Sequence, residues 1–141
     1  MSVAQIRELA GRGITFGCHS FTHSSLVAAS DAQLRREVHG AKAALQDALG
    51  CEISDFAYPY GQYDLRSRQA VAEARFRSAF GCREGLNFWN DRYSLRRTSV
   101  TETGLLWEWA FKVRTGRDPR TTARSLLRFF RGARGHQPYG E

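Results

Sequence analysis

Residues 30–58, with the sequence SDAQLRREVHGAKAALQDALGCEISDFAY, contain a helix followed by a strand, and this pair indicates the fold. Ser30 and Gln33 form a capping box that begins the helix, and Gly50 ends it. Residues 53–58 read as a short buried strand. The apolar residues that recur through the helix at helical spacing are Leu34, Val38, Ala41, Leu45 and Ala48.

The same alternation of helix and strand continues on both sides of this pair. We predict helices at 2–11, 64–74, 105–116 and 118–131, and strands at 14–18, 78–82 and 95–100. Strands separated by single helices predict an α/β fold with a parallel sheet. Three or four such strands make part of a sheet or barrel, because a closed (β/α) barrel needs eight.

Composition and charge restrict the classes of function. The 141 residues suffice for one domain, and the hydrophobic content of 42% is that of a globular protein. No membrane-spanning run or secretory signal is recognisable, which predicts a cytoplasmic location. The whole excess of the +7 net charge lies in residues 92–141. We expect no nucleic-acid partner there, because no DNA- or RNA-binding motif accompanies the charge.

The three cysteines predict neither a disulfide framework nor a thiolate zinc site. Cys18, Cys51 and Cys82 form no CxxC pair, and their number is odd. We therefore expect them to be small buried hydrophobic residues.

Two histidines, His19 and His23, directly follow the strand predicted at 14–18. Side chains four residues apart can converge on one metal ion, and imidazole suits Zn²⁺, Fe²⁺, Co²⁺ or Ni²⁺. A tight site needs a third ligand, usually a carboxylate. The alternative is a pair of partly exposed loop histidines that are bonded to the backbone.

The segment FAYPYGQYD, residues 56–64, forms a second candidate site. A strand runs here into an aromatic turn that proline stiffens. Such a loop can offer ring surfaces to a sugar and backbone N–H groups to an oxyanion. The alternative is a plain turn that ends a strand.

Together, these segments resemble the polysaccharide deacetylases with a NodB-homology domain. HSFTH at 19–23 matches that family's H-[S/T]-x-x-H metal motif, and FAYPYG at 56–61 is similar to its third motif. The helix predicted at 2–11 resembles the one that leads into the metal motif. Residues 81–87 and 95–100 resemble later stretches of the exopolysaccharide-cluster subgroup.

The resemblance implies a fold, a reaction and a set of site residues. The fold would be an irregular (β/α) barrel, here incomplete, and the activity would be metal-dependent hydrolysis of N-acetyl groups on a polysaccharide. His19 and His23 would bind a divalent metal, usually zinc. Tyr60 would direct its backbone N–H at the oxyanion, and the substrate would contact Tyr58, Pro59, Tyr60 and Gly61.

The chain departs from the family pattern in its catalytic carboxylates. The family's first motif, T-F-D-D-G, supplies the general base and the third metal ligand on a strand that would precede Ser2. The arginine that usually opens the third motif is Ala57 here, a change that the subgroup shares. Asp64 and Asp55 are the local carboxylates that could substitute. We therefore expect an N-terminally truncated member with impaired activity.

We predict three parts: a partial deacetylase domain at 1–116, a basic amphipathic helix at 117–131 and a flexible tail at 132–141. The helix carries Arg120, Arg124, Arg128 and Arg131 on one face. It can either contact an anionic membrane peripherally or pack on the barrel with a solvated arginine face. Besides a hydrolase, two hypotheses remain: a non-catalytic glycan- or metal-binding module, and a regulatory protein that acts through this helix.

Overall fold

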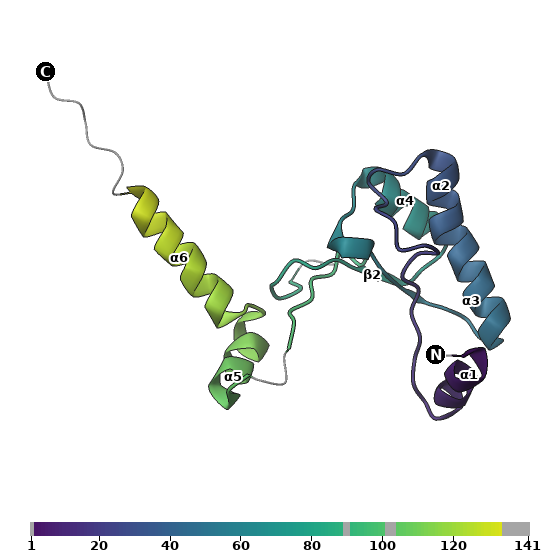
Figure 1. Cartoon of the computed structure of the whole chain (residues 1–141), viewed down its shortest axis with the longest axis horizontal. Coiled ribbons are helices and arrows are strands. Elements are labelled where there is room, and N and C mark those ends of the chain that lie inside the picture. The colour runs from purple at the N-terminus through teal and green to yellow at the C-terminus, as the bar shows by residue number, and fades with distance from the viewer. Residues whose placement is uncertain (1, 89–90, 101–103, 134–141) are drawn as a thin grey trace, which may run out of the picture. The chain divides into compact units, whose positions relative to one another are not determined.

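The computed structural model describes residues 2–88, 91–100 and 104–133 (Figure 1). The chain divides into two compact units. The first comprises Met1–Arg83 with Asn87–Arg96, and the second comprises Glu84–Leu86 with Arg97–Glu141. The predicted domain boundary at residue 116 does not coincide with this division. The tail predicted at 132–141 lies outside the described residues from 134 onward.

The first unit contains a parallel sheet, as predicted. Strand β1 (Asp55–Ala57) pairs with β2 (Ser78–Phe80) in parallel. Parallel bridges add Cys18 beside β1 and Leu95 beside β2. The order across the sheet is therefore Cys18, β1, β2, Leu95. The barrel stays a prediction, because these segments give only part of a sheet.

The strand predicted at 14–18 is wrong in its length, because only Cys18 pairs with β1. The backbone N–H of Ile14 donates instead to Leu9 O at 3.1 Å, so Ile14 belongs to the end of the preceding helix. That helix is α1 (Val3–Gly11), which begins at the predicted capping box. Ile14 is 52% exposed, whereas Cys18 at the other end of the segment is buried.

The strand predicted at 95–100 is likewise reduced to a single bridge, at Leu95. The side chain of Asn87 binds both backbone groups of Arg96, the residue after Leu95. Asn87 Oδ1 accepts from Arg96 N at 2.8 Å, and Asn87 Nδ2 donates to Arg96 O at 3.2 Å. Leu95 itself turns both backbone groups toward the β2 side: its N–H donates to Ala79 O and its carbonyl accepts from Gly81 N, each at 2.9 Å.

The helix predicted from the capping box at Ser30 and Gln33 is confirmed, and Gly50 ends it with a φ of 69°. Its middle departs from α-helical geometry in one π-helical turn. π turns occur often at functional sites. The three successive segments are α2 (Asp31–Arg35), η1 (Arg36–Gly40) and α3 (Ala41–Leu49).

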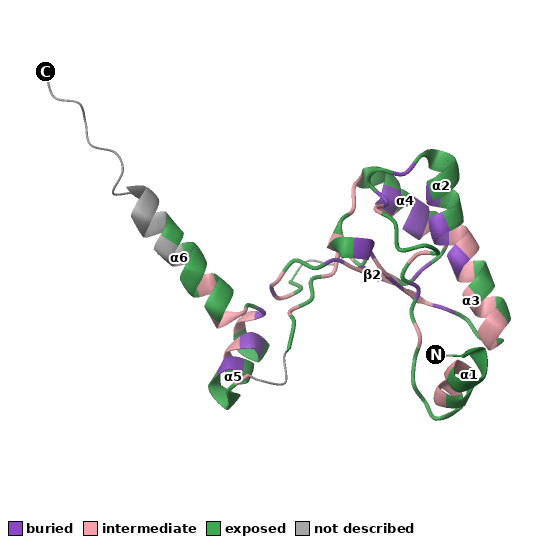
Figure 2. Cartoon of the chain, in the orientation of Figure 1, coloured by how far each residue is buried: buried purple, intermediate pink, exposed green. Residues whose placement is uncertain are grey.

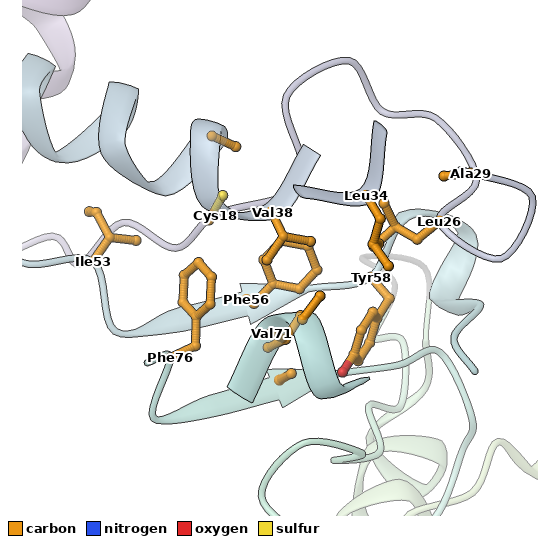
Figure 3. Close-up of a cluster of buried hydrophobic side chains, with 13 residues drawn as sticks. Cys18, Leu26, Ala29, Leu34, Val38, Ile53, Phe56, Tyr58, Val71 and Phe76 are labelled. Atoms are coloured by element: carbon orange, nitrogen blue, oxygen red, sulfur yellow. The ribbon is translucent and has the colours of Figure 1, made fainter. Parts of the chain in front are cut away.

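The core of the first unit lies between this helix, the sheet and α4 (Leu65–Glu73) (Figures 2 and 3). Phe56 is at its centre and is 1% exposed. Its ring centroid lies 5.2 Å from that of Phe76 and 5.4 Å from that of Tyr58. Val71 of α4 packs in the same cluster. The predicted apolar positions of the long helix that are buried here are Leu34, Val38 and Ala41.

The cysteine prediction holds for only one of the three residues. Cys18 is buried in the core, whereas Cys51 and Cys82 are exposed. Cys51 directly follows the helix end at Gly50, and Cys82 lies beyond the end of β2, so both occupy surface turns.

The second unit contains α5 (Leu106–Thr115) and α6 (Pro119–Ala133), which confirms both predicted helices. Two ion pairs connect them: Lys112 Nζ lies 2.6 Å from Asp118 Oδ2, and Arg120 Nε lies 2.9 Å from Glu108 Oε1. Because Lys112 and Glu108 are buried, these pairs bind α6 to α5 within one unit.

The basic face of α6 is exposed at Arg120, Arg124 and Arg128. The sequence predicts an apolar face at Ala123, Leu126, Leu127 and Phe130. Ala123 is exposed, and the other three side chains lie outside those that the structure describes, as does Arg131. Among the described helices, none is long and apolar enough to cross a bilayer. Peripheral membrane contact through α6 stays a prediction.

Helix α4 begins at Asp64, whose side chain caps it. Asp64 Oδ1 accepts from Ser67 N at 2.8 Å, and Ser67 Oγ accepts from Asp64 N at 2.8 Å. The backbone hydrogen bond from Ser67 lowers the pKa of the Asp64 carboxyl, although burial opposes this shift. We expect Asp64→Ala to lower the free energy of unfolding by about 0.5–2 kcal/mol in urea denaturation at neutral pH.

The pH dependence of this cap follows from the direction of the pKa shift. A carboxyl with a lowered folded-state pKa stabilises the fold above its ordinary pKa of about 3.9, and this stabilisation is lost as the pH falls toward the folded-state value. The difference between wild type and Asp64→Ala should therefore shrink in acid. Asp47→Ala, an exposed change within α3, is the control and should stay within about 0.5 kcal/mol. An equal loss in both variants would contradict the cap.

Candidate functional site

The two predicted metal ligands, His19 and His23, lie side by side after the sheet segment at Cys18. Their ring centroids are 4.8 Å apart and the planes meet at 77°. Both residues are exposed, so the rings face solvent. Left-handed backbone at Ser20 (φ 64°) and His23 (φ 60°) folds the intervening loop back on itself. Their function as metal ligands stays a prediction.

The hydrogen bond of His19 assigns its tautomer. His19 Nδ1 lies 2.7 Å from the carbonyl oxygen of Ala57. Since a carbonyl oxygen only accepts, Nδ1 must carry the proton. Neutral His19 therefore presents the lone pair of Nε2 to solvent. Metal-binding histidines commonly have this arrangement, with the second nitrogen donating to a carbonyl or carboxylate.

The aromatic turn lies next to this histidine pair. The ring centroid of Tyr60 is 4.8 Å from that of His23, and the Tyr60 side chain is 62% exposed. Tyr60 has a φ of 56° in the short helical turn η2 (Pro59–Gly61). Left-handed backbone costs a non-glycine residue about 1–2 kcal/mol, and such strain often accompanies functional sites.

The other predicted substrate residues differ from Tyr60 in exposure. Tyr58 is fully buried and its hydroxyl donates to Tyr93 O at 3.0 Å, so burial raises the pKa of this phenol. Its ring therefore belongs to the core, and the contact of Tyr58 with substrate stays a prediction. Pro59 is buried beneath the turn, and Gly61 is partly exposed.

The carboxylates considered as substitute ligands are engaged elsewhere. Asp64 caps α4, and Asp55 accepts a hydrogen bond from the Ser78 hydroxyl. Within residues 2–88, 91–100 and 104–133, no three His, Cys, Asp or Glu side chains are placed to hold one ion. The pair His19 and His23 thus fits a metal as two of its ligands, and the described residues do not supply the third.

One residue of the site was missed by the sequence analysis: Glu37, on η1. It is only 5% exposed, and its carboxylate accepts hydrogen bonds from the histidine loop at Phe21 and Thr22. Glu37 follows Leu34 by three residues and precedes Ala41 by four, which places it on the apolar face of the helix. A glutamate on the apolar face of a predicted helix could have indicated a buried carboxylate with hydrogen-bond partners, since buried glutamates are rare without them.

The Glu37 carboxylate is ionised in its buried position. Burial by itself would raise its pKa, but hydrogen bonds from the Thr22 backbone and hydroxyl and from the Phe21 backbone outweigh burial. The pKa therefore lies below its ordinary value. These hydrogen bonds, with a further one from the Ser20 side chain, fasten the loop between the two histidines to the long helix.

An apolar pocket of about 270 Å³ adjoins the other side of His19. Its walls come from α1, α3 and the histidine loop, including Val3, Ile6, Leu45 and Phe21. The histidine pair is thus flanked by the aromatic turn on one side and by apolar surface on the other.

Comparison with known families supports the sequence resemblance. The sequence profile described as polysaccharide deacetylase matches residues 2–79, more than half of the chain. This range contains both the histidine pair and the aromatic turn. Among curated proteins, no sequence matches the chain.

Several solved deacetylases have a similar fold. One is a deacetylase from Streptococcus pyogenes solved with acetate, with 25% identity and a TM-score of 0.70, where the match covers 73% of this chain and 46% of that one. A polysaccharide deacetylase from Bacillus cereus has 19% identity and a TM-score of 0.72, covering 80% and 36%. IcaB from Ammonifex degensii has 25% identity and a TM-score of 0.61, covering 72% and 48%. The chain therefore spans less than half the length of each.

Proposed function

Because the chain belongs to the polysaccharide deacetylase family, we propose that it takes part in hydrolysing N-acetyl groups on a carbohydrate polymer. The observation that supports this proposal is the convergence of His19 and His23 beside Tyr60. This arrangement brings two imidazole side chains that can bind a metal and one exposed aromatic ring to the same surface. The bond to be hydrolysed is the carbon–nitrogen bond of the acetamide group, which is not a peptide bond.

We propose that His19 and His23 hold a divalent metal, most often zinc in this family, whose members generally depend on such an ion. A bound divalent metal polarises the acetamide carbonyl and lowers the pKa of a water molecule. His19 is prepared for this task, because its Nδ1–H is bonded to Ala57 O and leaves Nε2 for the ion.

The aromatic turn would hold the substrate. The exposed Tyr60 ring offers an apolar face on which a sugar ring can stack. Its backbone N–H is the proposed donor to the oxyanion that develops on the acetamide oxygen. Pro59, buried below, fixes the position of the turn and would form the floor of the substrate groove.

A second candidate function is a glycan- or metal-binding module without catalysis. It is favoured by the absence of a carboxylate ligand beside the histidines within the described residues. A general acid or base contributes typically 10²–10⁴-fold in rate. We therefore expect the chain by itself to bind zinc weakly and to deacetylate poorly.

Zinc titration of the full chain tests the histidine pair. His19→Ala and His23→Ala should each weaken the affinity at least about tenfold, because losing a ligand costs no less than losing an outer-shell partner. His39→Ala, a change on η1 away from the pair, is the control and should leave the affinity unchanged. Equal affinity in all four proteins would contradict the metal site.

Acetate release from chito-oligosaccharides separates the two candidate functions. Release by wild type above that of the His19→Ala, His23→Ala double variant supports catalysis. If wild type binds the oligosaccharide but releases no acetate, and Tyr60→Ala no longer binds it, the result supports the binding module.

A further inference from the structure

Glu37 connects the long helix to the loop that carries both histidines. Its Oε2 accepts from Phe21 N at 2.9 Å and Thr22 N at 2.8 Å, and its Oε1 accepts from Thr22 Oγ1 at 2.7 Å. We propose that Glu37 is a positioning residue that keeps the His19 and His23 rings converged. The inference rests on the proposed metal function of that pair.

The loop needs such a support because its own backbone is unfavourable. Ser20 and His23 both adopt left-handed φ angles, which non-glycine residues rarely do. The two amides bonded to Glu37 lie between these two positions. Within the loop, Ser20 Oγ accepts from His23 N at 2.9 Å, which closes the turn, and the Ser20 side chain also hydrogen-bonds Glu37. Glu37 attaches the loop to the fold.

A carboxylate suits this position better than a neutral side chain. The Phe21 and Thr22 backbone N–H groups can only donate, the Thr22 hydroxyl donates here, and an ionised carboxylate has two oxygens that only accept. A glutamine of the same shape could still meet all three groups, because the Thr22 hydroxyl can accept from its NH₂ group. The Phe21 and Thr22 amides would then bond a neutral amide oxygen in place of a carboxylate, and hydrogen bonds to a charged acceptor are roughly twice as strong. The burial of Glu37 prevents water from compensating for the weaker bonds.

The surrounding helix holds Glu37 in place. Val38, the next residue, is fully buried in the core, so this part of η1 cannot rotate away from the sheet. Glu37 therefore connects a fixed element to a strained loop. Val38 also provides a matched comparison, because it is buried on the same helix turn and its apolar side chain cannot form the hydrogen bonds that Glu37 forms with the loop.

The test compares Glu37→Gln with Val38→Ala and Glu52→Gln in the full chain. Val38→Ala destabilises the same helix through the core, and Glu52→Gln makes the same chemical change at an exposed residue. The measurements are zinc affinity, NMR cross-relaxation between the His19 and His23 rings without metal, and the thermal midpoint. Thr22→Val removes one donor from the loop side and is the milder second variant.

We expect Glu37→Gln to weaken zinc binding by about 10–100-fold, the range for losing an outer-shell partner. The ring-to-ring signal should fall, as should amide protection at Phe21 and Thr22. Val38→Ala should lower the thermal midpoint yet keep both the signal and the affinity. Thr22→Val should also weaken zinc binding and the ring-to-ring signal, but by less than Glu37→Gln. Combining the two changes in one variant should weaken them little beyond Glu37→Gln.

The results separate this inference from the proposed function. Unchanged ring signals and unchanged zinc affinity in Glu37→Gln and Thr22→Val would overturn the positioning role. If wild type binds no zinc, the metal proposal fails, and the ring signal alone then decides whether Glu37 holds the pair. If Glu37→Gln does not fold, Thr22→Val decides by the same measurements. An equal loss of affinity in Val38→Ala would also overturn the inference, since general destabilisation would then explain it.

Discussion

Phe56→Ala is expected to lower the free energy of unfolding by about 3–5 kcal/mol, the range for truncating a buried phenylalanine. Phe56 is 1% exposed and lies on β1 between the long helix and α4. Its ring contacts Phe76 and Tyr58, so the change removes these contacts and leaves a cavity in the core. The free energy of unfolding of a small domain is about 5–15 kcal/mol in total, so this loss is a large part of it.

Urea denaturation followed by circular dichroism measures this loss. Phe88→Ala is the matched control, because Phe88 is 77% exposed and its truncation should change the free energy of unfolding by less than about 0.5 kcal/mol. A loss below about 1 kcal/mol in Phe56→Ala would show that the core does not depend on this ring.

Gly61→Ala is expected to destabilise the first unit by about 2–5 kcal/mol. Gly61 has a φ of 66°, which costs an alanine about 1–2 kcal/mol, and overpacking adds about 1–3 kcal/mol. An added Cβ would lie 2.5 Å from the backbone nitrogen of Cys82 and 2.4 Å from its Cβ. Since a backbone atom cannot rotate away, the turn at Tyr60 or the segment at Cys82 must move.

The same denaturation experiment tests Gly61→Ala against Gly11→Ala. A Cβ at Gly11 meets nothing within 4 Å among the described residues, and Gly11 ends α1 without a left-handed φ. Alanine there should be neutral or stabilise by up to about 1 kcal/mol. Similar effects at both glycines would contradict the close approach of the turn to Cys82. A shift of Tyr60 should also appear as a weaker contact between the Tyr60 and His23 rings.

Local signals in the sequence predicted the helices well. Ser2, Ser30 and Asp64 each begin a helix in the structure through a side chain that bonds a backbone N–H three residues later. Gly50 and Gly116 end helices in left-handed conformation. Caps act within a few residues, so a reader of the sequence can find them without knowing the fold.

Strand length was predicted less well, because pairing depends on distant segments. The sequence of 14–18 is as apolar as a buried strand, yet Ile14 bonds to Leu9 and only Cys18 reaches β1. In the same way, Leu95 is the residue of 95–100 that forms a bridge to β2. Neither event has a signal in the segment itself.

The sequence by itself determined the parallel α/β arrangement, the helix ends, the family and the candidate residues His19, His23 and Tyr60, because spacing and short motifs carry this information locally. Only the tertiary structure decided that Tyr58 belongs to the core, that Asp64 and Asp55 are engaged elsewhere, and that Glu37 supports the histidine loop. The physical reason is that burial and hydrogen-bond partners depend on residues far apart in the chain. Glu37 and Thr22 are 15 residues apart, and they meet only when the long helix packs against the end of the sheet.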